Sequence, residues 1–155
     1  MEIVKSEILT EEQKKDIIKL WNDEYPKDLS LLDVKAFDEY LNQLSDKQHL
    51  TITWENRIVG WLIYFVRESE QCFAMLLDSS VQGMGLGSKL LSKAKDYTPE
   101  LNGWVIDNNE QVKKDDTHYK SPIGFYKKNG FEIVPEIQTK KNNINGIRVR
   151  WKKAM

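Results

Sequence analysis

The residues of this chain with the clearest chemistry are the glycines between Val81 and Leu91, in the stretch VQGMGLGSKLL. An apolar run, CFAMLL, precedes them and ends at Asp78, and a helical pattern with Leu86 and Leu90 on one face follows. The order strand, glycine loop, helix leaves free backbone N–H groups at the positive end of a helix. Because glycine has no Cβ, a bulky anion can approach those amides closely. The stretch therefore predicts a site for an anionic group such as a pyrophosphate.

The spacing of these glycines excludes two common phosphate-binding motifs. A dinucleotide-binding fingerprint needs G-x-G-x-x-G early in a βαβ unit. Gly83, Gly85 and Gly87 instead give G-x-G-x-G after several expected strands. No G-x-x-x-x-G-K-[ST] occurs, so a Walker A loop is also excluded. Taken alone, the glycines could equally form only a tight turn.

The composition indicates one globular domain, residues 1–155, with 40% hydrophobic residues and a net charge of −1. Such a charge gives no basic field, so we expect no nucleic-acid partner. No apolar run approaches the roughly 20 residues of a membrane span, and no signal pattern is present. We therefore expect no membrane partner and a cytoplasmic protein. The lone Cys72, in an apolar run, predicts core packing, and with His49 and His118 it has no metal-ligand spacing, so no metal site is expected.

Hydrophobic periodicity predicts the element order β α α β β β α β α β β. The expected strands are residues 2–9, 49–54, 57–66, 71–77, 104–106, 131–137 and 144–151. The first expected helix begins at a Thr10–Gln13 capping box and ends before Tyr25-Pro26. The other expected helices span residues 33–45, 85–97 and 122–129. Ser121 is the expected N-cap of the last helix, and residues 110–120 read as a polar loop. The pattern predicts an α/β (α+β mixed) fold, with a mostly antiparallel mixed sheet of about seven strands flanked by four helices.

Two motifs resemble those of the GCN5-related N-acetyltransferases, the GNAT family. Gln82 to Gly87 fit [QR]-x-x-G-x-[GA], the acyl-CoA pyrophosphate motif of that family. About forty residues on, the stretch FYKKNGF looks like its second signature, with Tyr126 four residues before Gly130-Phe131. The element order corresponds over nearly the whole chain. The resemblance implies a GNAT-like acyl-CoA N-acyltransferase fold and acetyl-CoA as co-substrate.

The resemblance also implies where acetyl-CoA would bind. In the family, the strand before the glycine loop splays from its neighbour, and the cofactor lies in the resulting cleft. The main chain of Leu76, Leu77 and Asp78 would pair with the pantetheine arm. The loop and helix start would hold the pyrophosphate with the residues Gln82, Gly83, Met84, Gly85, Leu86, Gly87 and Ser88.

Catalytic roles follow from the same resemblance. The amide of Leu77 would face the thioester carbonyl like an oxyanion hole, and Tyr126 would protonate the departing thiolate. Tyr126 could instead be a core tyrosine. Asp78, Asp107 and Glu24 are candidate bases for the attacking amine, and a water chain to solvent would also serve.

One position departs from the family pattern. Many members carry an Asn seven residues before the tyrosine, where this chain has Tyr119. Asn108, Asn109 or Ser121 could take over that contact with pantetheine, and we place Asn108 in the expected cofactor site.

The acceptor is the least determined part. The family's specificity segment corresponds to residues 25–31, where Asp23, Glu24, Asp28 and Asp33 give an acidic bias. This bias would favour a cationic amine, small-molecule or peptide, or it is only a charged surface loop. The aromatic residues Trp54, Trp61 and Tyr64 could line an apolar wall, although strand aromatics are usually core.

Two other kinds of protein fit the pattern. A CoA-binding sensor or interaction module of the same fold that has lost turnover is the main alternative to an enzyme, and a plain interaction domain without CoA is a third hypothesis. A homodimer through the closing strands is compatible with each of them.

Overall fold

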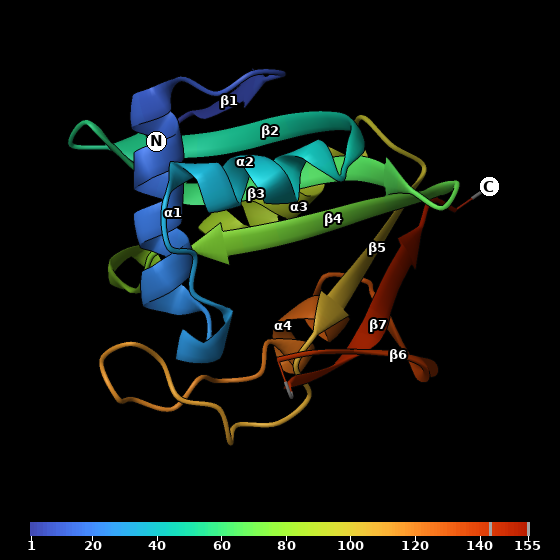
Figure 1. Ribbon diagram of the computed structural model, residues 1–155. Coiled ribbons are helices and arrows are strands. Elements are labelled where there is room, and N and C mark those ends of the chain that lie inside the picture. The colour runs from blue at the N-terminus through green and yellow to red at the C-terminus, as the bar shows by residue number, and fades with distance from the viewer. Residues whose placement is uncertain (143, 155) are drawn as a thin grey trace.

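The computed structural model describes residues 1–142 and 144–154, which form one seven-stranded sheet with helices on both faces (Figure 1). The strands are β1 (Ile3–Ser6), β2 (Ser45–Trp54), β3 (Arg57–Arg67), β4 (Glu70–Leu77), β5 (Glu100–Val105), β6 (Glu132–Lys141) and β7 (Ile144–Lys152). The helices are α1 (Glu11–Glu24), α2 (Val34–Asn42), α3 (Leu86–Lys95) and α4 (Ile123–Lys128), with short 3-10 turns η1 (Lys27–Leu29) and η2 (Ser79–Val81). This order of strands and α-helices confirms the predicted one. Within the described residues, no helix is long and apolar enough to cross a membrane.

The strands lie in the order β1-β2-β3-β4-β5-β7-β6. All neighbours are antiparallel except β4 and β5, which are parallel. The prediction of a mostly antiparallel mixed sheet is therefore confirmed. In Figure 1, α1 and α2 lie over the near face of β2–β4, and α3 lies behind them.

Each face of the sheet has its own hydrophobic core. The core under α1 and α2 includes Ile17, Phe37, Trp61 and Cys72, which confirms core packing for the cysteine. The core under α3 and α4 contains residues from five strands and both helices, among them Leu50, Leu62, Phe73, Leu90, Leu91, Leu101, Tyr126 and Val149. Fully burying one such side chain stabilises the fold by about 1.5–3 kcal/mol.

The predicted capping box of α1 is confirmed, and local contacts also define the start of α2 and the first hairpin. The Thr10 side chain accepts a hydrogen bond from the main-chain N–H of Gln13, and the Gln13 side chain accepts one from the main-chain N–H of Thr10. The capping box is therefore complete. Asp33 caps α2 through the amide of Ala36 at 2.9 Å. Glu55 and Asn56 have φ of 51° and 63°, the left-handed pair that a two-residue hairpin requires.

Several details differ from the prediction. Three strands have other bounds than expected: β1 ends at Ser6 and not at residue 9, β2 begins at Ser45 and not at 49, and β5 spans Glu100–Val105 and not 104–106. The second helix ends at Asn42, because Leu44, although buried at helical spacing, belongs to the connection into β2. Ser121 does not cap α4, which has no side-chain cap; its hydroxyl donates to the carbonyl of Ile106 instead. Trp104 was expected in a buried strand, but 38% of its surface is exposed on β5.

Candidate functional site

The site begins where β4 and β5 separate. These two strands pair at a single position, Cys72 opposite Asn102, and then diverge toward their C-terminal ends (Figure 1). The closed end is held by hydrogen bonds from Asn102 Nδ2 to the carbonyl of Gln71 at 3.0 Å and from Arg150 Nε to Asn102 Oδ1 at 2.8 Å. With no ladder beyond that point, the free edge of β4 can accept a partner that is not a strand of the sheet.

The edge of β4 exposes Leu77 and not its neighbours. The Asp78 amide donates to the carbonyl of Val59 on β3 at 2.8 Å, and the Asp78 carbonyl accepts from Val81. Because main-chain groups alternate between the two edges of an antiparallel strand, those of Leu76 also face β3, whereas those of Leu77 face the cleft. This geometry corrects the expectation for Leu76 and Asp78, whose main chain is used within the protein. The Leu77 amide faces the cleft, whereas the Leu77 carbonyl accepts a hydrogen bond from Gln82 Nε2.

Asp78 is unsuited to act as a base. Burial alone would raise the pKa of its carboxyl group, but hydrogen bonds from Ser80 and the nearby Arg57 guanidinium outweigh burial and lower that pKa. Arg57 Nη1 lies 2.9 Å from one carboxylate oxygen, and the amide of Ser80 lies 2.9 Å from the other. Asp107, the second candidate, is exposed and lines neither of the two cavities described below.

The glycine loop presents a row of amides to solvent. Gly83 and Gly85 have φ of +82° and +78°, and nothing lies within 4 Å of a Cβ placed on either of them. Gly85 is the N-cap of α3 and offers no side chain to the first turn. Within residues 1–142 and 144–154, no protein atom accepts a hydrogen bond from the amides of Gly83 to Ser88. The loop therefore has the open helix N-terminus that the sequence predicted.

Two residues of the motif also have structural roles. The side-chain Nε2 of Gln82 donates to the Leu77 carbonyl at 3.0 Å. The main-chain N–H of Gln82 donates to the carbonyl of Ser79 at 3.4 Å. Gln82 thus joins the loop to the end of β4. A Cβ on Gly87 would lie 2.9 Å from the Phe125 ring, so this glycine lets α3 approach α4.

Tyr126 lies in the core and borders the cleft. Its side chain is 6% exposed, and its ring packs edge-on against Phe73 and Phe131 at 5.7 and 5.3 Å. Burial, and secondarily the neighbouring phenol of Tyr119, raises the pKa of Tyr126 above its ordinary value of 10. Among the described residues, none forms a hydrogen bond with the Tyr126 hydroxyl, which remains protonated and able to donate.

The residues expected to replace the family's Asn are engaged elsewhere. Asn108 accepts the amide of Glu110 at 3.0 Å, and Asn109 accepts the amide of Ser121 at 2.7 Å. None of Asn108, Asn109 or Ser121 lines either of the two cavities described below. Tyr119 does, which the sequence did not predict, and its surroundings raise the pKa of its phenol to about 12 by burial.

The loop of residues 110–120, here called the strap, packs on the end of α1. The amide of Lys27 donates to the carbonyl of Val112 at 2.8 Å. Lys113 Nζ lies 3.1 Å from a Glu24 oxygen, and both side chains are at least four-fifths buried. Glu24 also accepts from the amide and hydroxyl of Ser79 at 2.9 and 2.7 Å. Glu24, the third candidate base, is therefore held as a structural carboxylate at the junction of three segments.

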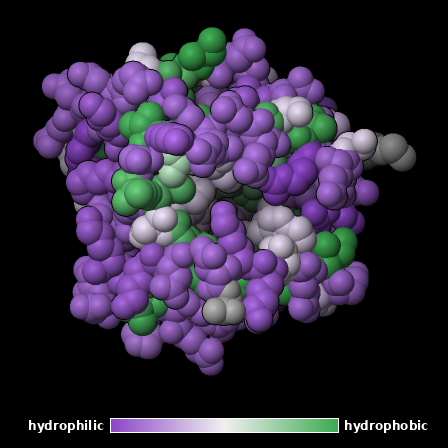
Figure 2. Space-filling model, in the orientation of Figure 1, coloured by the Kyte–Doolittle hydropathy of each residue, from purple (hydrophilic) through white to green (hydrophobic). Residues whose placement is uncertain are grey.

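Two adjoining cavities occupy the cleft, and Figure 2 shows the surface hollowed near the middle of this face. The first, of about 560 Å³, is here called the loop-side cavity and is lined by Glu24, Tyr25, Met75, Leu76, Leu77, Ser79, Gln82, Lys113 and residues 117–120. The second, of about 690 Å³, is here called the aromatic cavity. Its lining includes Trp21, Tyr25, Tyr40, Phe65, Phe73, Met75, Trp104, Tyr119 and Tyr126. Tyr25, Met75 and Tyr119 border both cavities.

The acidic bias around α1 does not reach the aromatic cavity. Asp23 is paired with Lys19 at 2.6 Å and with Lys114 at 3.7 Å, and Asp33 serves as the cap of α2. Neither of these aspartates lines a cavity, and neither does Asp28. The acidic segment therefore places no aspartate in either cavity, and its Glu24, which lines the loop-side cavity, is paired with Lys113.

The strand aromatics Trp54, Trp61 and Tyr64 line neither cavity, and the core alternative holds for Trp61 and for Tyr64, which is 7% exposed. Trp61 is fully buried and donates to His49 Nδ1 at 3.0 Å, while Trp54 is 44% exposed away from both cavities. Trp21 and Tyr40 line the aromatic cavity instead. Only Tyr25 was in the segment predicted to set specificity, and helical periodicity alone could not separate the other two from core.

Comparison with known proteins agrees with this geometry. The family model described as "Acetyltransferase (GNAT) domain" matches residues 45–133, more than half of the chain. The peptidyl-lysine N-acetyltransferase YjaB of Escherichia coli (strain K12) is 36% identical over 61 residues, 39% of this chain. The matched stretch spans 35% of that protein, about a third of its length.

Solved structures share the fold over almost the full length. An aminoglycoside 6'-N-acetyltransferase complexed with coenzyme A has a TM-score of 0.72 and 14% identity, covering 98% of this chain and 97% of that chain. The ribosomal-protein-S18-alanine N-acetyltransferase from Escherichia coli has a TM-score of 0.68 and 17% identity, covering 99% of this chain and 96% of that chain. At these identities the likeness extends to the fold alone.

Proposed function

This chain belongs to the GNAT acetyltransferase family, and from that premise we propose that it transfers an acetyl group from acetyl-CoA to a primary amine. Transfer is direct, within a ternary complex of protein, acetyl-CoA and amine. The observation that carries the proposal is the row of unpaired amides from Gly83 to Ser88, which lies beside the unpaired edge of β4. An anion and an extended arm attached to it fit these two features together.

The glycine loop supports binding of the pyrophosphate. Gly83 and Gly85 adopt positive φ with open space around them, so an anion can reach the amides without meeting a side chain. The N-terminus of α3 adds the positive end of a helix dipole, which favours negative charge there. The Leu77 amide faces the cleft and would meet the thioester end of the pantetheine arm, while the Leu77 carbonyl already accepts a hydrogen bond from Gln82 Nε2 at 3.0 Å.

The chemistry needs a hydrogen-bond donor at the carbonyl and an acid at the sulfur. When the amine nitrogen bonds to the thioester carbon, negative charge develops on the carbonyl oxygen, where the Leu77 amide would donate. One preorganised donor of this kind is worth about 3 kcal/mol. The C–S bond breaks with its electron pair going to sulfur, and the Tyr126 phenol would supply the proton that makes the thiol.

The surplus proton of the amine goes to water. Asp78 and Glu24 are both engaged by hydrogen bonds and cations, so neither is available as a base. Water reaches the cleft through the hollow in the surface, takes the proton from nitrogen and returns one to the tyrosinate. The acceptor therefore reacts as the neutral amine.

A two-stage measurement tests the proposal. Acetyl-CoA at 100 times its Kd should stabilise the protein by about 2.7 kcal/mol, which a thermal-shift assay detects easily. Release of the CoA thiol is then followed with a panel of primary amines. Binding with release on at least one amine is the expected result. Binding without release on any amine would indicate the silent CoA-binding module, and no thermal shift would exclude CoA altogether.

A further inference from the structure

One wall of the aromatic cavity consists of edge-to-face rings from α1, its C-terminal cap and α2. Trp21 lies between Tyr25 and Tyr40, with ring centroids 4.9 and 5.1 Å away and edge-to-face angles of 79° and 74°. The Trp21 indole nitrogen donates to the carbonyl of Leu29 at 2.8 Å, which fixes the indole plane. Such a wall is already formed before any ligand enters, so a flat ring can pack on it at little entropic cost.

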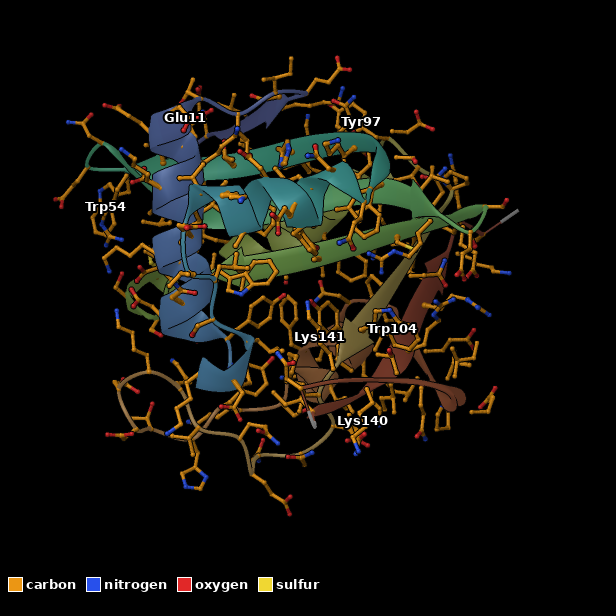
Figure 3. The ribbon with its side chains drawn as sticks, viewed as in Figure 1. Glu11, Trp54, Tyr97, Trp104, Lys140 and Lys141 are labelled. Carbon is orange, nitrogen blue, oxygen red and sulfur yellow. The ribbon has the colours of Figure 1, made fainter. Side chains whose placement is uncertain are left out.

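The opposite side of the cavity comes from the far part of the sheet. Trp104 on β5 lines it with 38% of its surface exposed, and the Arg148 guanidinium holds the indole from 4.8 Å. Figure 3 shows Trp104 and Lys141 below β4 in that view, on the part of the sheet beyond the splay. At the tip of the β6–β7 hairpin, Asn142 Nδ2 donates to the carbonyl of Asp28 in η1 at 2.9 Å. This contact bridges the two sides and limits the width of the opening.

The charges in this cavity do not suit a polycation. Of the described lining residues, the charged ones are Arg67, Glu68 and Lys141, two cations and one carboxylate. Glu68 is exposed in the β3–β4 turn. A second or third ammonium group on a substrate would thus meet one solvated carboxylate and two like charges. Desolvating such a group without a partner is costly.

Phenol hydroxyls are among the polar groups that line the cavity. In the part of the chain that the structure describes, no hydrogen bond joins the hydroxyls of Tyr25, Tyr40 or Tyr119 to a protein atom, although all three residues line the space. These groups can bind ring substituents, and the rings themselves attract a single ammonium group as it enters.

We infer that the acceptor is a primary monoamine joined by a short chain to a flat aromatic ring, and not a polyamine, an aminoglycoside or a lysine on a folded protein. The ring would pack between the Trp21 and Trp104 sides, with the amine directed toward Leu77 and Tyr126. This inference names the acceptor class and rests on the proposed function.

The first test measures binding and turnover separately. Binding of phenethylamine, tryptamine, spermidine, kanamycin and a lysine-containing peptide to the CoA-saturated protein is measured by calorimetry, and thiol release from acetyl-CoA is measured with each of them. We expect the aromatic monoamines to bind at least about tenfold more tightly than the polycations and the peptide. Equal or tighter binding of a polycation or the peptide overturns the inference, whatever the turnover. Tight aromatic binding without thiol release contradicts the proposed function and leaves the acceptor pocket supported.

A matched pair of variants locates the binding. Tyr40→Leu removes one ring of the wall and should weaken phenethylamine binding about tenfold. Tyr97→Leu is the control, because Tyr97 is 46% exposed, stacks on Tyr64 and lines neither cavity. Tyr40→Phe keeps the ring and should keep the affinity, which separates a lost contact from a damaged fold. Equal affinity in Tyr40→Leu and Tyr97→Leu would overturn the inference.

A charge reversal gives an independent readout. Lys141 is exposed at the end of β6, so Lys141→Glu is expected to fold. The change should strengthen spermidine binding a few-fold and leave phenethylamine binding within about twofold. An unchanged ratio of the two affinities would contradict the inference that the charged lining residues disfavour polycations.

Discussion

The two halves of the cleft are built from different parts of the polypeptide. The glycine loop uses main-chain amides of consecutive residues, Gly83 to Ser88, and depends on two positive φ angles. The aromatic cavity uses side chains from α1, α2, β3, β4, β5, the strap, α4 and the β6–β7 hairpin. One half is a local feature of the chain, and the other exists only in the folded molecule.

This difference determines how each half responds to substitution. A main-chain site changes when a substitution alters φ or closes the approach, and is largely indifferent to which exposed side chain is present. A side-chain site changes its ligand when one ring or charge is exchanged. Cofactor use should therefore be robust in this fold, whereas acceptor choice should shift easily.

The largest effect is expected at Tyr126, which lines the aromatic cavity. Tyr126→Phe removes the proposed acid but keeps the ring that packs on Phe73 and Phe131. We expect turnover to fall at least about 100-fold, because general acids typically contribute that much. The acetyl-CoA thermal shift should be unchanged. Turnover within a few-fold of the parent protein would contradict the acid role and return Tyr126 to the core.

The pH profile sharpens the same point. Burial raises the pKa of the Tyr126 phenol above 10, and the acid is active in its protonated form. The loss of activity that an ordinary phenol would show near pH 10 is therefore displaced to higher pH. Turnover measured in the parent protein at saturating substrate should therefore keep rising through about pH 10 as the amine deprotonates, because the acid stays protonated there. A falling limb centred below pH 10 would contradict Tyr126 as the acid.

A smaller effect is expected from a methyl group in the glycine loop. Gly85 has φ of +78° with open space around its Cβ position, so Gly85→Ala adds backbone strain and no clash. If the loop changes its conformation to relieve about 1 kcal/mol of this strain, its amides no longer point toward the pyrophosphate site. Acetyl-CoA binding should then weaken up to about tenfold. The affinity and the melting temperature are measured together.

Gly124→Ala is the matched control for that change. Gly124 lies in α4, has no positive φ, and also has nothing within 4 Å of its Cβ position. Alanine is the better helix former by roughly 1 kcal/mol, so this variant should be as stable as the parent protein or more so. If both variants bind acetyl-CoA equally well and melt alike, the loop conformation is not what holds the cofactor.

The same contrast explains what could be predicted from the sequence. The element order, the capping box at Thr10 and the open loop at Gly83–Gly85 were predicted correctly, because each depends on residues close together in the chain. The orientation of Leu77 was expected from the family resemblance, and its edge of β4 does face the cleft. The failure at Leu76 and Asp78 arose because the two edges of a strand alternate, and pairing with β3 decides which edge is free.

The acceptor half could not be derived in this way. Trp21 has the spacing of an ordinary core residue, and only the fold shows that it also borders a cavity. The acidic bias before α2 was visible, but the pairing of Asp23 with Lys19 and Lys114 depends partly on the strap, which is far away in the sequence. Tyr119 was noted as a departure from the family, and only its position between the two cavities gives it a role.

The smallest effect is expected from substitutions of two neighbouring lysines of the strap, the loop whose Tyr119 borders both cavities. Lys113 and Glu24 are 17% and 10% exposed at 3.1 Å, whereas Lys114 is 67% exposed and lies 3.7 Å from Asp23. Lys113→Met keeps the aliphatic stem but leaves a mostly buried carboxylate without its cation, which should lower the free energy of unfolding by about 1–2 kcal/mol. Lys114→Met should change it by less than about 0.5 kcal/mol. Urea unfolding measures both. Glu24 also accepts a hydrogen bond from Ser79 at the start of the glycine loop. Equal effects of the two substitutions would therefore mean that Ser79 alone satisfies the carboxylate. The strap would then pack on α1 without contributing measurably to stability.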